Sequence, residues 1–410
     1  MKEKILGYTF LGPFDRQKYV FKDLFQNLNK EFKKYYIIDL NCLILKKKNI
    51  NKEYLKNKNF FSPKNYAELD EFLKKYQLVT FISLGKTFEY FRTLYLFKKY
   101  DVKLILNMSI GVNKEFKFFK KKIFSFKNEK FSFLIFRFFV MINIFPKIDH
   151  MFEGSLENID LIKKQIGQKI FRIFPFINIK YIQNLHHINC RAYDSYLNLS
   201  NKAREDYIVF LDGGFDHPDV KRHGIGQSRK NRKKYYFFLN RILLLLQKFY
   251  NKKIIFCVHP KVNSTVIKKY LSKKIKVIKY RTQYYILRAH TTVSHESSTT
   301  FDALILKKRL ININSRLMGP FYYDRNKYYP KRVNIPSYEM ENYQTIKKED
   351  IEKFFKNKDD LYDDYLKNFV KNFKDYKKIY FGKKNSSLKN KYDNLPGTLQ
   401  ILKTIKNQYF

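Results

Sequence analysis

The feature that most constrains the fold is a regular alternation of short apolar segments with longer amphipathic segments through the first three quarters of the chain. The apolar segments have the length of buried strands, and the amphipathic segments have the period of helices that pack on one face. This alternation is typical of βαβ units, which build parallel sheets. The predicted strands are Ile5–Phe10, Tyr35–Leu40, Leu78–Leu84, Val102–Met108, Lys169–Phe174, Tyr207–Leu211, Lys253–Val258, Ile275–Ile278, Thr292–Ser294 and Leu310–Ile313.

The alternation occurs twice, with a polar stretch from Asn178 to Asp206 between the two series. A chain of 410 residues is also longer than one hydrophobic core usually serves. We therefore predict an α/β fold with two Rossmann-like domains that face a cleft, residues 1–190 and 191–347, followed by a helical, Lys-rich segment, residues 348–410. Ligands of such sheets bind outside the carboxyl ends of the strands, so residues that follow predicted strands are the candidates for function.

The charge of the chain is strongly positive, with 83 Lys and Arg against 37 Asp and Glu, a net charge of +46. Such a surplus is typical of proteins that bind nucleic acid or anionic membranes. Lys, Phe, Ile, Asn and Tyr are also the residues that A/T-rich codons favour, so the charge alone does not identify a partner. Three scattered cysteines, Cys42, Cys190 and Cys257, do not form a disulfide framework, which favours a reducing, cytoplasmic compartment.

One segment departs from the βαβ pattern. Lysines are dense between Lys114 and Lys130, and the aromatic run Phe131–Phe145 follows. This run is too short and too charged to span a bilayer. One interpretation is a buried helix behind a solvated loop. The other is a basic and aromatic patch, Lys114–Phe145, that binds the anionic inner membrane peripherally.

Two motifs at predicted strand ends carry groups that bind phosphate. His259-Pro260-Lys261 ends a strand, where Pro260 turns the chain and the His259 imidazole is available to donate to a phosphate or to act as acid or base. The loop His295-Glu296-Ser297-Ser298-Thr299-Thr300 ends a later strand and opens a predicted helix, Phe301–Leu306. Helix capping needs one hydroxyl, so four in succession favour an additional anion site.

A third motif, Asp212-Gly213-Gly214 followed by Asp216-His217-Pro218-Asp219, ends the strand Tyr207–Leu211. The glycines permit a close backbone approach to a ligand, and Asp212 and His217 offer polar contacts or a base. Metal-ligand spacing is absent, so we predict no metal. Neither of the common Gly-rich phosphate-loop motifs occurs.

The order of these motifs resembles the C-terminal half of GT-B glycosyltransferases that make bacterial capsule and O-antigen polysaccharides. The resemblance covers about Tyr207 to Ile313. It rests on Phe210-Leu211-Asp212, His217-Pro218-Asp219, Tyr235-Tyr236, Val258-His259-Pro260, Thr292-Val293-Ser294-His295 and Ser297-Ser298-Thr299. The His-Pro and Ser-Ser elements are also distantly similar to those of bacterial sialyltransferases and CDP-glycerol glycerophosphotransferases. The N-terminal half shows no such match, and the acidic base motif of the sialyltransferases is missing there.

The resemblance implies a glycosyltransferase that moves a sugar from a nucleotide donor, with a CMP-sugar favoured, to a lipid-linked or surface glycan. In the similar families the His-Pro histidine and the paired serines meet the nucleotide phosphates, which implies that role for His259, Ser297, Ser298 and Thr299. The nucleotide-sugar is a substrate, and no cofactor is expected. Asp15 and Asp212 are the rival candidates for the catalytic base. The loops Gly12–Asp15 and Ser83–Lys86 are the candidates for acceptor contacts.

Two alternatives remain open. An enzyme on the same fold could transfer a polyol phosphate, such as glycerol phosphate, instead of a sugar. A basic nucleic-acid-binding protein would explain the net charge of +46, although no nucleic-acid-binding motif occurs in the chain.

Overall fold

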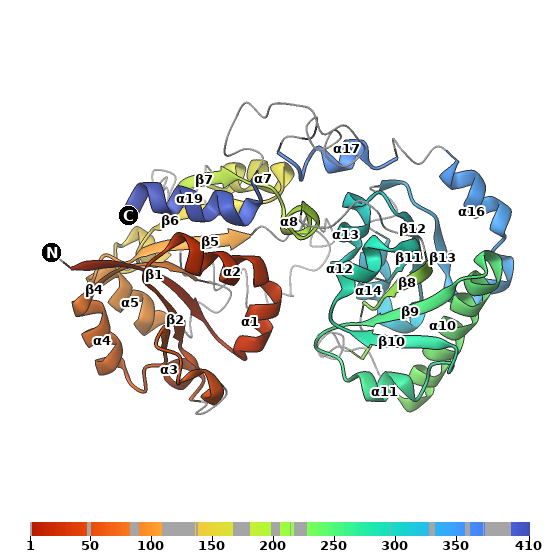
Figure 1. Ribbon diagram of the computed structural model, residues 1–410, viewed down its shortest axis with the longest axis horizontal. Helices are drawn as coiled ribbons and strands as arrows, with labels where there is room; N and C mark the ends of the chain where they lie inside the picture. Colours follow the sequence, from red (N-terminus) through yellow and green to blue (C-terminus); the bar gives the residue numbers. More distant parts are fainter. Residues whose placement is uncertain are drawn as a thin grey trace. The chain divides into compact units, whose positions relative to one another are not determined.

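The computed structural model describes residues 2–46, 51–82, 90–108, 136, 138–166, 181–197, 206–213, 215–216, 228–295, 297–327, 333–356, 361–371, 373 and 395–410. These residues divide between two compact units. The first unit contains the described residues up to Asp194 together with 369–371, 373 and 395–410, and the second contains those from Ser195 to Asn368. Figure 1 shows one parallel sheet in each unit, so the prediction of two Rossmann-like α/β domains is confirmed.

The sheet of the first unit has the strand order β3-β2-β1-β4-β5-β6-β7, with every pair parallel. The strands are β1 (Glu3–Phe10), β2 (Tyr35–Asp39), β3 (Phe60–Phe61), β4 (Tyr76–Phe81), β5 (Lys103–Met108), β6 (Ile148–Glu153) and β7 (Ile182–His187). The order 3-2-1-4-5-6 is that of the Rossmann fold, and its direction of growth reverses between β1 and β4.

Helices cover both faces of this sheet because successive strand residues point to opposite sides. Ile5 packs with α4 (Tyr66–Lys75) and α5 (Phe91–Lys99), whereas its neighbour Leu6 packs with α2 (Lys22–Glu31). The remaining helices are α1 (Phe14–Val20), α3 (Asn41–Leu45), η1 (Lys52–Tyr54), α7 (Leu156–Ile166) and α19 (Gly397–Tyr409), and α8 (Arg191–Leu197) runs across the boundary between the two units.

The sheet of the second unit has the order β10-β9-β8-β11-β12-β13 and is also parallel throughout. The strands are β8 (Tyr207–Leu211), β9 (Lys253–Val258), β10 (Ile275–Lys279), β11 (Ala289–Ser294), β12 (Arg309–Asn314) and β13 (Ser337–Glu339). This order repeats the Rossmann arrangement, and it reverses between β8 and β11.

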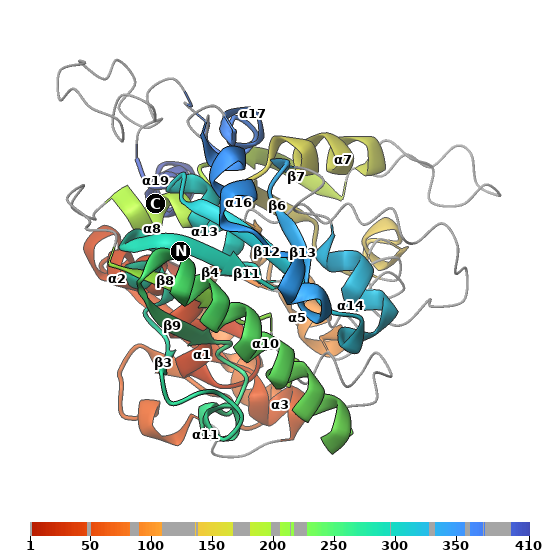
Figure 2. The ribbon, with the colours of Figure 1, turned by 90° about the vertical axis from the view of Figure 1, so that its right-hand side faces the viewer.

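The long helix α10 (Arg229–Tyr250) lies across one face of the second sheet (Figure 2). Its buried side chains, among them Leu239 and Leu243, share a core with Phe210 of β8 and Phe256 of β9. The other helices of the unit are α11 (Ser264–Lys268), α12 (Thr282–Leu287), α13 (Thr300–Ile305), η3 (Arg316–Met318), α14 (Gly319–Asn326), η4 (Met340–Thr345), α16 (Lys348–Phe355) and α17 (Asp363–Leu366).

The polar stretch that separates the two predicted series is not a simple linker. It contains the edge strand β7 and the helix α8. The sequence of β7, Ile-Gln-Asn-Leu-His-His, is polar because five of its six residues are at least partly exposed. The strands β3, β6 and β13 were also not predicted, and the predicted strand Lys169–Phe174 lies outside the described residues.

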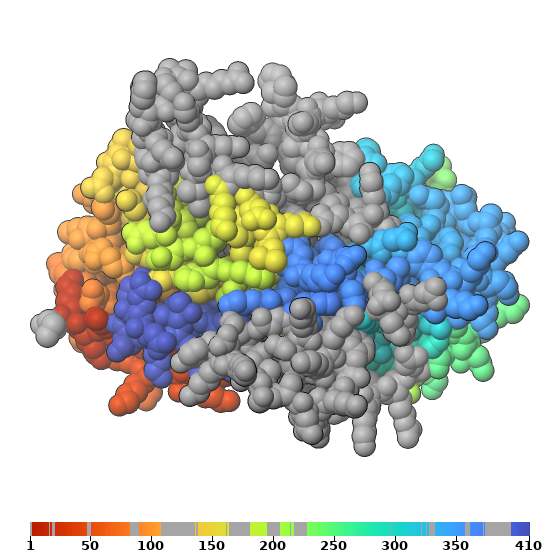
Figure 3. Space-filling view, turned by 90° about the horizontal axis from the view of Figure 1, so that it is seen from above, coloured from red at the N-terminus to blue at the C-terminus, as the bar shows by residue number. Residues whose placement is uncertain are grey.

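The C-terminal residues are divided between the two units. Helices α16 and α17 belong to the second unit, whereas α19 belongs to the first. Ile401, Leu402 and Ile405 of α19 are buried in the core that contains Leu24 and Leu28 of α2. In Figure 3 the dark blue residues of α19 lie beside red residues from the N-terminal part of the chain. Helix α19 therefore completes the layer that covers one face of the first sheet.

The aromatic run proposed for membrane contact is only partly described. Phe136, Val140 and Phe145 are buried in the core of the first unit, while Phe138 and Ile142 are exposed. The burial supports the helix interpretation for this part of the run, and the Lys cluster lies outside the described residues. In the described part of the chain, no helix combines the length and the apolar character needed to cross a membrane.

A histidine pair, of which His150 is buried and His186 partly exposed, predicts how the stability of the first unit depends on pH. His150 Nδ1 lies 2.8 Å from His186 Nε2, and His150 Nε2 lies 3.0 Å from the Tyr409 hydroxyl of α19. Burial lowers the pKa of His150 to about 4, and burial also lowers the pKa of His186. Histidine has an ordinary pKa of about 6.5. As the pH falls below this value, the two side chains therefore bind protons more readily in the unfolded chain than in the folded one.

We expect the free energy of unfolding to fall as the pH is lowered from about 6.5 to about 4. Thermal melts across this range measure the effect, and His150→Asn is expected to reduce the pH dependence. A His150→Asn variant with the same pH dependence as the wild type would assign the acid sensitivity to other groups.

Candidate functional site

Three predicted site residues meet at one edge of the second sheet. Asp212 directly follows β8, His259 follows β9 and His295 follows β11, and these three strands are neighbours in the order β9-β8-β11. Because all the strands are parallel, their carboxyl ends lie at the same edge. The edge includes the reversal between β8 and β11, which is the usual ligand position in such sheets.

Asp212 ties the ends of two strands together. Its backbone N–H donates to the Cys257 carbonyl at 3.1 Å, and its Oδ2 accepts from the His259 backbone N–H at 3.2 Å. The residue is only 3% exposed. These contacts give Asp212 a role in positioning the His259 loop, and Gly213 beside it is buried.

The His259 loop fixes which nitrogen of the imidazole carries a proton. The Lys261 N–H donates to His259 Nδ1 at 3.2 Å, and the Val262 N–H donates to the His259 carbonyl at 2.9 Å. Pro260 lies within this turn, where it has no N–H to satisfy. Since Nδ1 accepts, the neutral ring carries its proton on Nε2, which makes that nitrogen a donor.

His295 is buried and remains uncharged near neutral pH. The residue is 1% exposed, and burial lowers its pKa to about 3. Its Nδ1 lies 2.8 Å from the Tyr235 hydroxyl, and the Tyr235 ring stacks on Phe215 at 4.4 Å between centroids. His295 Nε2 has no hydrogen-bond partner among the described residues. The contact between His295 and Tyr235 links the β11–α13 loop to helix α10.

The second tyrosine of the pair holds the loop after β8. The Tyr236 hydroxyl donates to Asp216 Oδ2 at 3.0 Å, and Arg232 forms a 2.6 Å ion pair with Asp216 Oδ1. Asp216 is therefore engaged within the protein. The positioning roles of Arg232, Tyr235 and Tyr236 were not predicted, although the Tyr-Tyr pair at the start of a helix was a visible signal.

The residues of the hydroxyl-rich loop, 297–300, differ in their exposure and in their hydrogen bonds. The Ser297 hydroxyl lies 2.8 Å from the Thr299 hydroxyl, and Thr299 occupies the N-cap position of α13 without a side-chain capping bond. Ser298 is exposed, whereas Thr300 is fully buried and hydrogen-bonds to Ser294. Capping thus does not account for the Thr299 hydroxyl, and Thr300 contributes to packing. Gly214, His217 and Glu296 lie outside the described residues.

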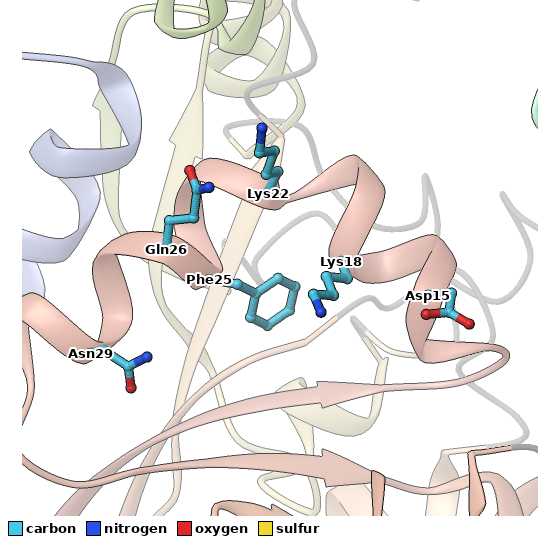
Figure 4. Close-up of a pocket in the computed structure, with 6 residues that line it drawn as sticks. All are labelled: Asp15, Lys18, Lys22, Phe25, Gln26 and Asn29. Atoms are coloured by element: carbon cyan, nitrogen blue, oxygen red, sulfur yellow. The ribbon is translucent and has the colours of Figure 1, made fainter. Parts of the chain in front are cut away.

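Asp15 belongs to the first unit, on helix α1. It is exposed, and its carboxylate accepts a hydrogen bond from the Tyr54 hydroxyl, which raises the pKa of Tyr54 to about 12. Asp15 also lines a surface pocket of α1 and α2 (Figure 4). The other predicted acceptor loop, Ser83–Lys86, lies outside the described residues.

No group of three or more His, Cys, Asp or Glu side chains in the described ranges is arranged to hold a metal ion. The carboxylates at the edge of the second sheet, Asp212 and Asp216, are engaged within the protein, and the groups offered to a ligand are imidazoles, hydroxyls and backbone N–H groups. Their chemistry is that of anion binding, with donors that carry no full charge.

Comparisons with known proteins give no close relative. No protein-family model matches the chain, and no curated protein matches it in sequence. Among solved structures, a UDP-N-acetylglucosamine 2-epimerase aligns with 14% identity and a TM-score of 0.47, over 94% of this chain and 99% of that one. Phytolacca americana UGT2, complexed with UDP-2fluoro-glucose and pterostilbene, aligns over all of both chains with 8% identity and a TM-score of 0.48.

Spinosyn rhamnosyltransferase SpnG, complexed with thymidine diphosphate, aligns with 10% identity and a TM-score of 0.44, over 98% of this chain and 100% of that one. These similarities are too distant to assign a function to the chain.

Proposed function

We propose that this protein is a metal-independent glycosyltransferase whose second unit binds a nucleotide-activated sugar at the carboxyl edge of its sheet. The observation that carries the proposal is the convergence of His259, His295 and the Ser297–Thr299 loop beside the strand-order reversal. A nucleotide phosphate needs several donors at such a position. A CMP-sugar is the favoured donor because of the motif resemblance.

The reaction breaks the bond between the sugar and a phosphate oxygen, so negative charge develops on the leaving nucleotide. The Nε2–H of His259 and the exposed Ser298 hydroxyl would donate to that oxygen. Donors placed in advance stabilise developing charge more effectively than water, which must reorient. Asp212 would support this work indirectly, by holding the His259 backbone.

The acceptor glycan would bind to the first unit, and Asp15 is the better candidate for the catalytic base. Its carboxylate is exposed and lines a pocket, whereas Asp212 is buried and holds a backbone N–H. Asp15 would accept the proton of the acceptor hydroxyl while that oxygen forms the new bond to the sugar carbon.

A thermal-shift screen with CMP, CDP, UDP and GDP tests the proposal. A ligand that binds the folded state raises the melting temperature by mass action. We expect the largest shift with a cytidine nucleotide, and we expect the Ser298→Ala variant to show a smaller one. The absence of a shift with every nucleotide would contradict the proposal.

Transfer of a polyol phosphate is the second candidate, since the same donors would bind a phosphate whichever group leaves. Mass spectrometry of the product separates the two reactions. Only a polyol-phosphate transferase adds a phosphate to the acceptor, whereas a glycosyltransferase adds the mass of a sugar alone.

EDTA is expected to leave turnover largely unchanged. The proposed phosphate donors His259 and Ser298 carry no full charge, and the carboxylates Asp212 and Asp216 are already engaged within the protein. Rates measured with and without EDTA provide the test. A complete loss that magnesium or manganese restores would contradict metal independence.

A further inference from the structure

Helices α1 and α2 carry a pocket on the surface of the first unit. Its volume is about 490 Å³, within the range of small-ligand sites. In Figure 4 the Phe25 ring lies at the centre, with Asp15 and Lys18 on one side and Gln26 and Asn29 on the other. The sixth lining residue is Lys22.

The Phe25 ring gives the pocket a rigid apolar floor. It meets Tyr8 edge-on at 4.8 Å between ring centroids and Phe14 at 5.2 Å, and both partners are buried. Phe25 itself is half-buried, so part of its surface faces the pocket. Ligand sites commonly combine an apolar surface of this kind with a few polar groups that orient the ligand.

The charge that lines the pocket is mainly positive, with two lysines and one aspartate. Lys18 and Lys22 are exposed, and neither ammonium group forms an ion pair with a residue in the described ranges. The carboxylate of Asp15 accepts a hydrogen bond from the Tyr54 hydroxyl. An anionic group on a ligand would therefore meet two ammonium groups that no described carboxylate engages. Gln26 and Asn29 add amide donors and acceptors for hydroxyl groups.

The pocket rests on a well-held part of the fold. Helix α1 follows β1, one of the two strands at which the order of the first sheet reverses. Two buried amides hold the connecting loop. Asn41 Oδ1 accepts from the Gly12 N–H at 2.7 Å, and Asn51 Oδ1 accepts from the Phe14 N–H at 2.7 Å. The connecting loop lies at the carboxyl end of β1, the edge at which α/β sheets usually bind ligands, and the pocket begins on the helix that follows it.

We propose that this pocket binds an anionic sugar unit of the acceptor glycan, one that carries a carboxylate or a phosphate. The sugar packs on Phe25, its anionic group lies against Lys18 and Lys22, and its hydroxyls meet Gln26 and Asn29. Asp15 at the rim then faces a hydroxyl of the bound glycan. The identification of the ligand as an acceptor rests on the proposed function.

Two matched pairs of probes test the proposal by calorimetric titration of the full chain. Hyaluronan tetrasaccharide is compared with neutral N-acetylchitotetraose, and glucose 6-phosphate is compared with glucose. We expect the charged member of at least one pair to bind about fivefold more tightly or better, because two exposed ion pairs form. The preferred pair then identifies carboxylate or phosphate.

The double variant Lys18→Gln and Lys22→Gln is expected to remove this preference, and Phe25→Leu to weaken both members of the pair. The matched control is Lys30→Gln with Lys33→Gln, which removes the same charge from exposed positions that do not line the pocket. Equal affinity within both pairs, or an equal loss in the control variant, would overturn the proposal.

The CMP thermal shift, measured on the same variants, keeps this inference separate from the proposed function. We expect the double variant Lys18→Gln and Lys22→Gln to retain the wild-type thermal shift with CMP. Loss of nucleotide binding in every protein, with the sugar preference intact, would contradict the glycosyltransferase and leave an anionic-sugar site. A retained nucleotide shift without any preference for the charged sugars would contradict the pocket proposal and leave the proposed function standing.

Discussion

Replacing His259 by Ala is expected to lower turnover about 10- to 1000-fold while the second unit remains folded. The variant removes the Nε2–H donor, whose position is fixed by the Lys261 N–H on Nδ1 at 3.2 Å. The lost interaction is strongest when charge develops on the leaving phosphate, so the loss should appear mainly in kcat. Steady-state kinetics with a CMP-sugar and a glycan acceptor measure it.

His259→Gln and Thr265→Ala are the controls for this experiment. Gln retains an N–H donor at a similar distance from the backbone, so we expect part of the rate to return. Thr265 is an exposed residue on the adjacent helix α11, and its replacement should leave the rate unchanged. Wild-type turnover in both His259→Ala and Ser298→Ala would show that this edge of the sheet does not bind the donor phosphate.

Replacing Gly397 by Ala is expected to destabilise the first unit by roughly 2 to 3 kcal/mol, the upper part of the usual cost of overpacking a well-filled site. A Cβ atom at this position would lie 2.1 Å from the backbone oxygen of Asn189. That carbonyl cannot rotate away like a side chain. The N-terminus of α19 must therefore move, together with the apolar side chains that the helix buries.

The same movement would break the contacts of a buried carboxylate. Asp194 accepts from the Gly397 N–H at 2.6 Å, from the Thr398 N–H at 2.8 Å and from the Thr398 hydroxyl at 2.7 Å. Chemical denaturation of Gly397→Ala is compared with that of Gln408→Ala, an exposed substitution on the same helix. A midpoint unchanged from that of the control would show that α19 does not stabilise the unit.

Local sequence patterns were enough to predict the class of fold and the positions of the two site histidines at strand ends. The predicted strands Tyr207–Leu211 and Lys253–Val258 agree with β8 and β9 to the residue. Local pattern was sufficient there because a strand buried on both faces must be a continuous apolar run. His259 and His295 could be placed at strand ends for the same reason.

The strand order and the partners of the polar groups became known only from the folded chain. The edge strand β7 escaped prediction because its exposed side chains are polar, and β13 has only three residues. Tyr235 meets His295, sixty positions later in the chain, and Asp194 meets Gly397, more than two hundred positions later. Such contacts depend on how whole helices pack, and no local spacing encodes them. The apolar face of α19 has the same pattern as that of any amphipathic helix, so its sequence does not show which unit it packs against.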